Sequence, residues 1–123
     1  MFKVEPLVKY SEKYMICIDQ AKQRLKIHNA PIKQKAPDIS KYEVIYIGAP
    51  IYWGKMPEEL STAPQSLNFE GKIVKPFVTH EGSGISQVPQ QLQELCIGAK
   101  ILDGLEIFGF KVNCSKSDVK NWV

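Results

Sequence analysis

The sequence predicts an α/β domain built on a doubly wound parallel sheet, because apolar runs of strand length alternate with helical patterns. Three dense runs cover residues 43–50, 72–79 and 100–109. In the first run, residues 44–47 are all apolar, which is typical of a parallel strand covered on both faces. This alternation favours right-handed crossovers, and therefore a single parallel sheet with helices on both sides.

The chain opens with a shorter strand candidate over residues 2–8, which Pro6 is expected to bend. A helix follows, with Ser11 as its expected N-cap. Side chains spaced three or four residues apart give this helix one face for packing: Tyr14, Ile18, Ala21 and Leu25. The opening segment therefore predicts a strand followed by a helix.

Two further helices are expected between the dense apolar runs. One begins at Pro57, a residue suited to a first helical turn, and is cut short by Pro64, which has no N–H to donate. The other has Ser86 as its cap and Gly98 as its stop. The packing face of this second helix is formed by Val88, Leu92 and Leu95.

A last short helix is expected to end at Trp122. Ser115 and Asp118 form an approximate capping pair at its start. The resulting order β-α-β-α-β-α-β-α contains no linker, repeat or low-complexity tract. Residues 1–123 are therefore expected to form one domain.

Composition and charge disfavour two classes of partner. The 123 residues are 44% apolar and 24% charged, as in ordinary soluble globular domains. The net charge of +3 comes from scattered lysines, which favours a solvated surface over nucleic-acid binding. No apolar run is long enough to span a bilayer, and the charged opening is unlike a signal peptide. The sequence predicts binding to neither nucleic acid nor membrane.

The three cysteines are odd in number, widely spaced and without a CxxC pair. This pattern favours reduced thiols in a cytoplasmic protein. A structural zinc site needs four ligands, and only His28 and His80 are available to complete a set with the cysteines. No metal site is expected.

The residues after the strands are the candidates for a ligand site, because open parallel sheets bind ligands at the carboxyl ends of their strands. Tyr52 and Trp53 follow the run that ends at Pro50, and either ring can stack on a planar ligand. The next run is followed by residues 80–84, where the backbone N–H groups of residues 81–84 can donate to a carbonyl edge. A flavin offers both a planar ring and such an edge.

Several strings, in order and correctly spaced, carry a family resemblance. They include PIYWGKMP at residues 50–57, NFEGK at 68–72, THEGSG at 79–84 and LDGL at 102–105. With them, essentially the whole chain resembles the flavodoxin-like family of bacterial FMN proteins. The resemblance implies a three-layer flavodoxin-like fold with sheet order 2-1-3-4-5, FMN at the strand ends, and a role in electron transfer or as an oxidoreductase.

The resemblance also implies which residues contact the cofactor, whereas it assigns no catalytic residue. One loop would lie beside the isoalloxazine ring, with Trp53 as the main ring contact, and the other along the polar edge of the ring. The residues of the two loops are Pro50, Ile51, Tyr52, Trp53, Gly54, Thr79, His80, Glu81, Gly82, Ser83 and Gly84.

The chain departs from the family at its start. Members normally open with a strand and a phosphate-binding turn of the form S-x-T-G-N-T that begins a helix, and no such string occurs here. The fold is therefore expected to be incomplete, without family strand 1 and helix 1. The edges of residues 2–8 and 43–50 would then be exposed and favour a homo-oligomer or a partner chain. Affinity for FMN should fall, because the phosphate loses its anchor.

Three interpretations stay open at this point. The chain is an FMN-dependent electron carrier or reductase, completed where necessary by a partner. Alternatively, it is a non-catalytic remnant or interaction module that keeps the fold without binding FMN alone. In the third, the missing strand is encoded just upstream of Met1. His80 is read either as a proton donor or as a hydrogen-bonded loop residue.

Overall fold

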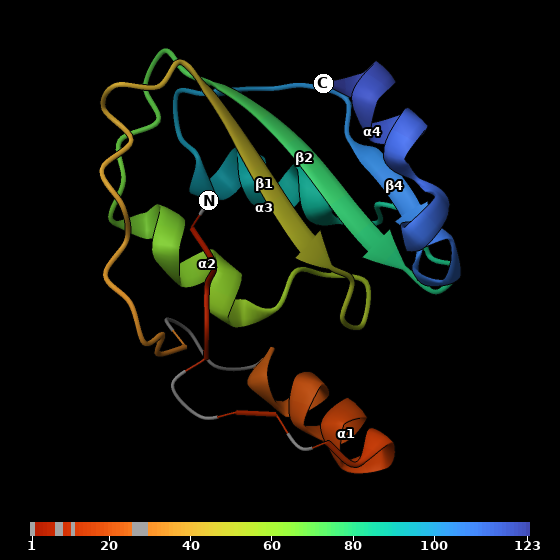
Figure 1. Cartoon of the computed structure of the whole chain (residues 1–123). Helices are drawn as coiled ribbons and strands as arrows, with labels where there is room; N and C mark the ends of the chain where they lie inside the picture. Colours follow the sequence, from red (N-terminus) through yellow and green to blue (C-terminus); the bar gives the residue numbers. More distant parts are fainter. Residues whose placement is uncertain (1, 7–8, 11, 26–29) are drawn as a thin grey trace.

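The computed structural model describes residues 2–6, 9–10, 12–25 and 30–123. A parallel sheet lies at its centre (Figure 1). Strand β1 (Val44–Pro50) pairs along its whole length with β2 (Ile73–His80). The other edge of β2 pairs first with β3 (Lys100–Ile101) and then with β4 (Leu105–Phe108). The single strand expected over residues 100–109 is therefore broken into two.

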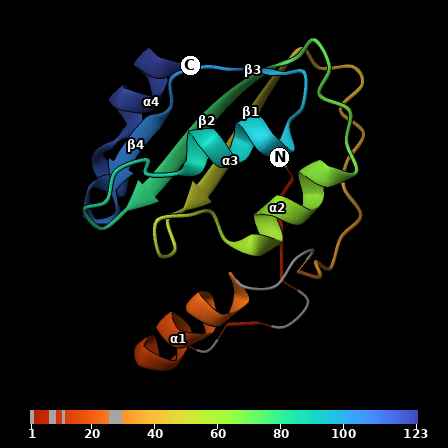
Figure 2. The same cartoon turned by 180° about the vertical axis from the view of Figure 1, so that it is seen from behind.

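Helices cover the two faces of the sheet unequally. Helices α2 (Glu58–Gln65) and α3 (Val88–Leu95) pack on one face, as Figure 2 shows from behind. The 3₁₀ helix η1 (Gly109–Cys114) leads into α4 (Lys116–Trp122), which packs on the opposite face. The main core lies under α2 and α3 and includes Met56, Phe69, Val74, Val78, Val88 and Leu92. The predicted α/β class with a parallel sheet is confirmed.

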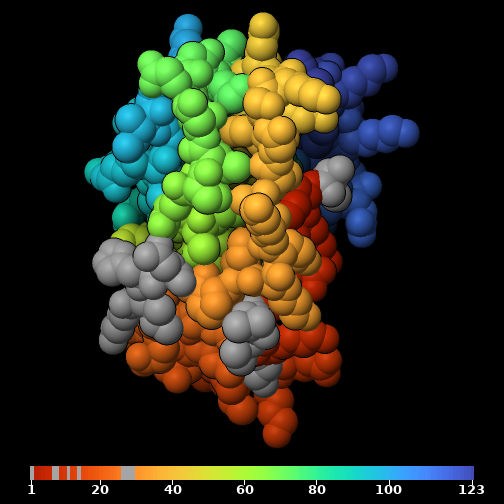
Figure 3. All heavy atoms as spheres, turned by 90° about the vertical axis from the view of Figure 1, so that its left-hand side faces the viewer, coloured from red at the N-terminus to blue at the C-terminus, as the bar shows by residue number. Residues whose placement is uncertain are grey.

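Helix α1 (Tyr14–Arg24) lies at the end of the sheet where the strands terminate (Figure 1). Residues 30–43 then return along the side of the molecule next to α2, as Figure 3 shows in orange and green. The Thr62 hydroxyl of α2 donates a 2.7 Å hydrogen bond to the Ala30 carbonyl and joins this segment to the helix. None of the helices in the described ranges is long and apolar enough to cross a membrane.

The strand expected over residues 2–8 is absent from the described residues 2–6. Pro6 forms only an isolated bridge with Ile32, and the Glu5 carbonyl accepts a 3.0 Å bond from the Lys33 N–H. Residues 7 and 8 lie outside the described ranges. The apolar pattern was correct for an extended segment, but a strand also needs a neighbouring strand, and none is placed beside residues 2–6.

The expectation that both faces of β1 are covered was also wrong. Val44 is 40% exposed and Tyr46 is 44% exposed, because α4 does not extend over the outer part of the sheet. On the other face, Ile45 and Ile47 pack against the main core. Strand β1 is therefore covered on one face and half open on the other.

Helix ends differ from the expected caps. Ser11 lies outside the described residues, and Lys13 stands at the N-cap of α1. Ser86 has φ 51°, outside the usual range of a capping residue, and α3 begins one residue later, after Gln87, whose side chain makes no capping bond. The Ser115 hydroxyl donates to the Val112 carbonyl at 2.7 Å and makes no cap. Pro64 lies inside the last turn of α2, which ends one residue later and is short as expected.

Candidate functional site

The two predicted loops meet at the carboxyl ends of β1 and β2. Pro50 lies opposite Thr79 in the parallel register, and the Ile51 N–H donates to the Thr79 carbonyl at 3.0 Å. Farther out, the Gln87 N–H donates to the Gly54 carbonyl at 3.2 Å. The sequence therefore located both loops correctly at one edge of the sheet, where a ligand would be held.

The first loop contains a tight turn over residues 52–55, called here the Trp53 turn. Tyr52 and Lys55 exchange both of their backbone hydrogen bonds, at 2.8 and 3.1 Å. Trp53 and Gly54 have φ values of 54° and 80°, as a type I′ turn requires. Glycine adopts this conformation freely, whereas for an L side chain it costs about 1–2 kcal/mol. A bulky tryptophan held there at 53% exposure is a strained residue that needs a reason.

Helix α1 holds the indole of Trp53 in place. The indole N–H donates to the Ile18 carbonyl at 3.1 Å, and the Lys22 ammonium lies 5.1 Å from the ring centroid. Tyr52 behaves differently, because its half-buried ring packs edge-on against Tyr10 at 5.7 Å. Burial raises the pKa of Tyr52, and the neighbouring Cys17 and Glu59 add to the shift. Of the two aromatic residues, only Trp53 presents a large exposed ring.

The second loop, residues 80–84, is organised by His80 and is called here the His80 loop. The His80 side chain is only 5% exposed and packs on Phe108 with ring centroids 4.3 Å apart. Its Nδ1 atom accepts hydrogen bonds from the backbone N–H groups of Gly82 at 2.9 Å and Gly84 at 3.1 Å. An Nδ1 that accepts two bonds places the proton on Nε2. His80 is therefore a positioning residue for the loop, which agrees with its interpretation as a hydrogen-bonded loop residue.

These bonds correct one expectation about the loop amides. The N–H groups of Gly82 and Gly84 point inward to His80, so they are not available to the edge of a planar ligand. Among the described residues, the Glu81 and Ser83 N–H groups have no hydrogen-bond partner within the chain. The Glu106 carboxylate accepts the Ile85 N–H at 2.8 Å and closes the far end of the loop. Two N–H groups of the loop are therefore left unpaired within the chain.

A largely buried ion pair, for which the sequence contains no local signal, ties α1 to α2. The Arg24 guanidinium contacts the Glu59 carboxylate at 3.0 Å, with side chains 14% and 5% exposed. The Tyr10 hydroxyl donates to Glu59 Oε2 at 3.1 Å, and the Arg24 guanidinium lies 3.8 Å from the Tyr10 ring centroid. Burial, together with the Glu59 charge, raises the pKa of Tyr10 to about 12. This cluster fixes the helix that supports Trp53.

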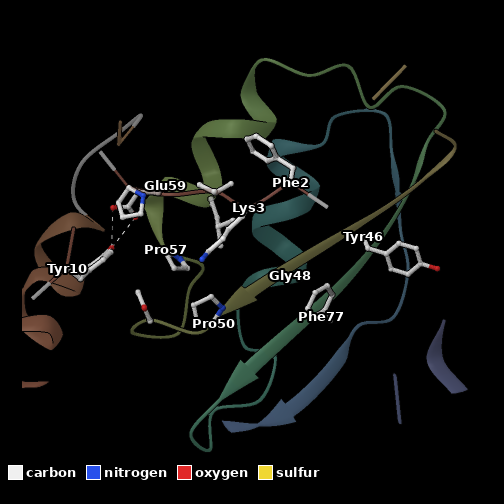
Figure 4. Close-up of a pocket in the computed structure, with 13 residues that line it drawn as sticks. Phe2, Lys3, Tyr10, Tyr46, Gly48, Pro50, Pro57, Glu59 and Phe77 are labelled. Atoms are coloured by element: carbon white, nitrogen blue, oxygen red, sulfur yellow. Dashed lines mark hydrogen bonds between the residues drawn. The ribbon is translucent and has the colours of Figure 1, made fainter. Parts of the chain in front are cut away.

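A hollow of about 440 Å³ opens between residues 2–6 and β1 (Figure 4). At its end near the carboxyl ends of the strands it is lined by Tyr10, Tyr52, Pro50, Pro57 and Glu59. Helix α2 begins here with two carboxylates, Glu58 and Glu59, which disfavour an anion at that helix start. The glycine-rich His80 loop lies between β2 and α3, but its Gly82 and Gly84 N–H groups donate to His80 and are not available to a phosphate.

The described residues contain no group of three or more His, Cys, Asp or Glu side chains arranged to hold a metal ion. All three cysteines are free thiols. Cys96 is buried, and burial raises its pKa to about 11. Such a thiol stays protonated at neutral pH and is a poor nucleophile.

An open parallel sheet with two loops meeting at its strand ends, one of them carrying an exposed aromatic ring, is typical of α/β proteins that bind planar cofactors. Comparison with family models is specific: the flavodoxin model matches residues 2–123. The chain belongs to the flavodoxin family. No curated protein matches the sequence.

Solved structures agree with this assignment. A candidate flavoprotein from Bacteroides uniformis ATCC 8492 is 26% identical, with a TM-score of 0.77 over 95% of this chain and 78% of its own. A candidate flavoprotein from Bacteroides eggerthii DSM 20697 is 25% identical, with a TM-score of 0.66 over 83% and 67%. A Lactobacillus acidophilus NCFM flavoprotein in complex with FMN is 17% identical, with a TM-score of 0.66 over 97% and 76%. At 17% identity, the similarity to this last structure supports the shared fold alone.

Proposed function

We propose that this protein binds FMN through the isoalloxazine ring, at the site between the Trp53 turn and the His80 loop, and that it serves in electron transfer. The single observation that carries the proposal is Trp53, held at φ 54° with 53% of its surface exposed at the strand ends. Backbone strain concentrates where a ligand uses it. Membership of the flavodoxin family, together with the FMN in the Lactobacillus acidophilus NCFM structure, supports FMN as the ligand.

The residues fit the ring of the cofactor in two respects. The exposed indole of Trp53 offers a stacking surface, and the unpaired N–H groups of the exposed residues Glu81 and Ser83 offer donors for the polar edge of the ring. His80 holds the loop that carries those donors, and Pro50, Ile51, Gly54 and Thr79 form the framework that joins the two loops. Bound FMN supplies the redox chemistry, and the protein supplies position and fixed dipoles.

The residues do not fit the phosphate equally well. Carboxylates begin α2, and the described residues offer no cradle of backbone N–H groups beside the strand ends. We therefore expect the ring to provide most of the binding energy. A well-formed charged contact with the phosphate would favour FMN by about 1.5–3 kcal/mol, and this site offers no such contact. Riboflavin, which lacks the phosphate, should therefore bind with an affinity within about threefold of that of FMN.

Titration of the protein into riboflavin and FMN, followed by flavin fluorescence, tests the proposal. Trp53→Leu should weaken both ligands at least about fivefold, since aromatic stacking is worth about 1–3 kcal/mol. The matched control is Trp122→Leu, which removes the indole that packs on the opposite face of the sheet. Flavin binding that ignores the Trp53 substitution would contradict the site. An FMN affinity far above that of riboflavin would reveal a phosphate site.

A second candidate function is an interaction module that binds no flavin. It is favoured by the hydrogen bonds that the site already makes within the chain, from Trp53 to Ile18 and from Gly82 and Gly84 to His80. A folded protein that leaves the fluorescence of both flavins unchanged would support this function over the first.

A further inference from the structure

The outer edge of β1 carries a row of unpaired backbone groups. The Ile73 N–H donates to the Glu43 carbonyl at 2.8 Å, and the Ile51 N–H donates to the Thr79 carbonyl at 3.0 Å. The direction of the backbone N–H and C=O groups alternates along a parallel strand. In the residues between these two bonds, the groups of the odd-numbered residues therefore point toward β2. The backbone N–H and C=O groups of Val44, Tyr46 and Gly48 therefore point away from β2, as does the C=O group of Pro50. In the described ranges, these groups have no backbone partner.

A trough runs along this edge. The hollow of about 440 Å³ adjoins a second of about 370 Å³, and both are lined by Phe2, Val4, Tyr46, Gly48 and Leu60. Residues 2–6 form the wall that faces β1 (Figure 4). In Figure 1 this segment, drawn in red, runs beside α2 and forms no strand. The trough therefore lies between an unpaired strand edge and an extended stretch of chain.

The walls of the trough are mostly apolar on both sides of the sheet, with Lys3 and Glu59 as their charged members. On the side of the main core they include Ile39, Ile45 and Ile47. On the open side they include Tyr46 and Phe77, which are 44% and 38% exposed. An occupant that fits has apolar side chains on both of its faces, as a strand inside a parallel sheet does.

The row of donors and acceptors identifies the chemistry of the occupant. Three N–H groups spaced two residues apart, interleaved with carbonyls, match the backbone of an extended polypeptide. The wall formed by residues 2–6 stands across the trough from β1 and obstructs the approach of a second folded sheet edge. A single strand avoids that obstruction.

We propose that this protein binds an apolar β-strand of another polypeptide in the trough, paired along the outer edge of β1. The strand adds to the sheet between β1 and residues 2–6 and satisfies the outward backbone groups of β1. Its middle carries consecutive Val, Ile or aromatic side chains and no charge. This inference is independent of flavin binding, because it concerns the strand edge and not the loops at the strand ends.

Hydrogen exchange measured by NMR at each amide tests the pairing directly. In the free protein at about 20 µM, the amides of Val44, Tyr46 and Gly48 should exchange fast, while those of Ile45, Ile47 and Ala49 should be protected by at least about a hundredfold. The probe is a blocked peptide, KVIVYVK, together with variants in which Val and Ile are exchanged. Binding should protect the three outward amides to the level of the inward ones. A control peptide, KVPVPVK, lacks the central N–H groups and should leave them unprotected.

A substitution on the wall provides the second arm. Tyr46→Lys places an ammonium group in the trough and should weaken the peptide at least about tenfold, because a buried unpaired charge is strongly disfavoured. Ile97→Lys is the matched control, since Ile97 is 76% exposed and does not line the trough. Unchanged protection of Ile45, Ile47 and Ala49 shows that each variant is folded.

Three results would overturn the proposal. The first is protection of Val44, Tyr46 and Gly48 in the free monomer, which would mean that the chain covers its own edge. The second is protection that rises with protein concentration as dimers form, which would assign the edge to a second copy. The third is a failure of every probe peptide to change their exchange. Flavin titration of the same samples measures flavin binding separately, so a failure of strand binding can be distinguished from a failure of flavin binding.

Discussion

The half of the sheet around β2 differs sharply from the half around β1. Val74 and Val78 on β2 are fully buried, and both edges of that strand are paired. On β1, Ile45 and Ile47, which face the same core, are only partly buried, and one edge is unpaired. Both strands are rich in apolar residues, so the difference comes from the number of neighbours each strand has. Stability is therefore expected to reside in the closed half, and recognition in the open half.

The largest expected effect is in the closed half. Leu92 of α3 has no exposed surface, so Leu92→Ala should lower the free energy of unfolding by about 3 kcal/mol through the cavity it leaves. Val44→Ala, in the open half, should lower it by about 0.5 kcal/mol or less. Urea unfolding followed by circular dichroism measures both. Equal losses would show that the two halves are covered to the same extent in solution.

The His80 loop belongs to the closed half. His80→Leu should lower the free energy of unfolding by about 2 kcal/mol, because the N–H groups of Gly82 and Gly84 lose their acceptor. Their hydrogen exchange should quicken relative to the amides of β2. His80→Asn, which keeps an acceptor on a shorter side chain, should recover part of the loss. Unchanged exchange at Gly82 and Gly84 in the leucine variant would contradict the positioning role.

The open half should respond to alkaline pH through Tyr10. Its pKa is raised from 10.0 to about 12, so its contribution to stability is complete below pH 10 and is lost as the pH rises toward 12. Because Tyr10 is partly exposed, solvent screening limits the loss to about 1 kcal/mol. The comparison is urea unfolding of the wild type and Tyr10→Phe from pH 8 to 11.5. Tyr42→Phe is the control and should show the same pH dependence of stability as the wild type. If Tyr10→Phe also showed the wild-type pH dependence, Tyr10 would not be the titrating group.

The smallest expected effect on stability has the opposite sign. Trp53→Asn creates an Asn-Gly pair, which favours the type I′ turn seen at residues 52–55. Relief of strain should outweigh the lost bond to Ile18 and stabilise the protein by about 0.5 kcal/mol. Flavin binding should be lost in the same variant. A clear destabilisation would mean that the indole contributes more to packing than its exposure implies.

The sequence was most informative where local pattern and burial coincide. Strands β1 and β2 fall within one residue of their predicted bounds, since their apolar runs leave few alternatives. The two loops at the strand ends followed from the same reasoning. That Trp53 stands out from Tyr52 is visible only in the structure, because it depends on the positive φ of the turn and on Tyr10. Whether these loops bind flavin is still a prediction.

Tertiary contacts explain what sequence could not provide. The strand predicted over residues 100–109 is interrupted at residues 102–104, where Gly104 packs so closely that a Cβ would overlap Ile85 and crowd Pro76. Residues 2–6 have strand composition but no strand beside them. The pairing of Arg24 with Glu59 joins two helices far apart in the sequence. None of these features has a local signature.

Lys75 has a consequence for how the open face is kept in order. Its ammonium group donates to the Trp122 carbonyl at 2.8 Å and lies 5.6 Å from the Tyr46 ring centroid and 4.9 Å from that of Trp122. Lys75, a charged residue in the middle of an apolar strand, therefore anchors the last turn of α4 to the sheet through one backbone carbonyl and two aromatic rings. The hydrogen bond and one of the two ring contacts of Lys75 depend on Trp122. Removing two residues from the carboxyl terminus would leave the lysine as a solvated cation and widen the bare face of the sheet.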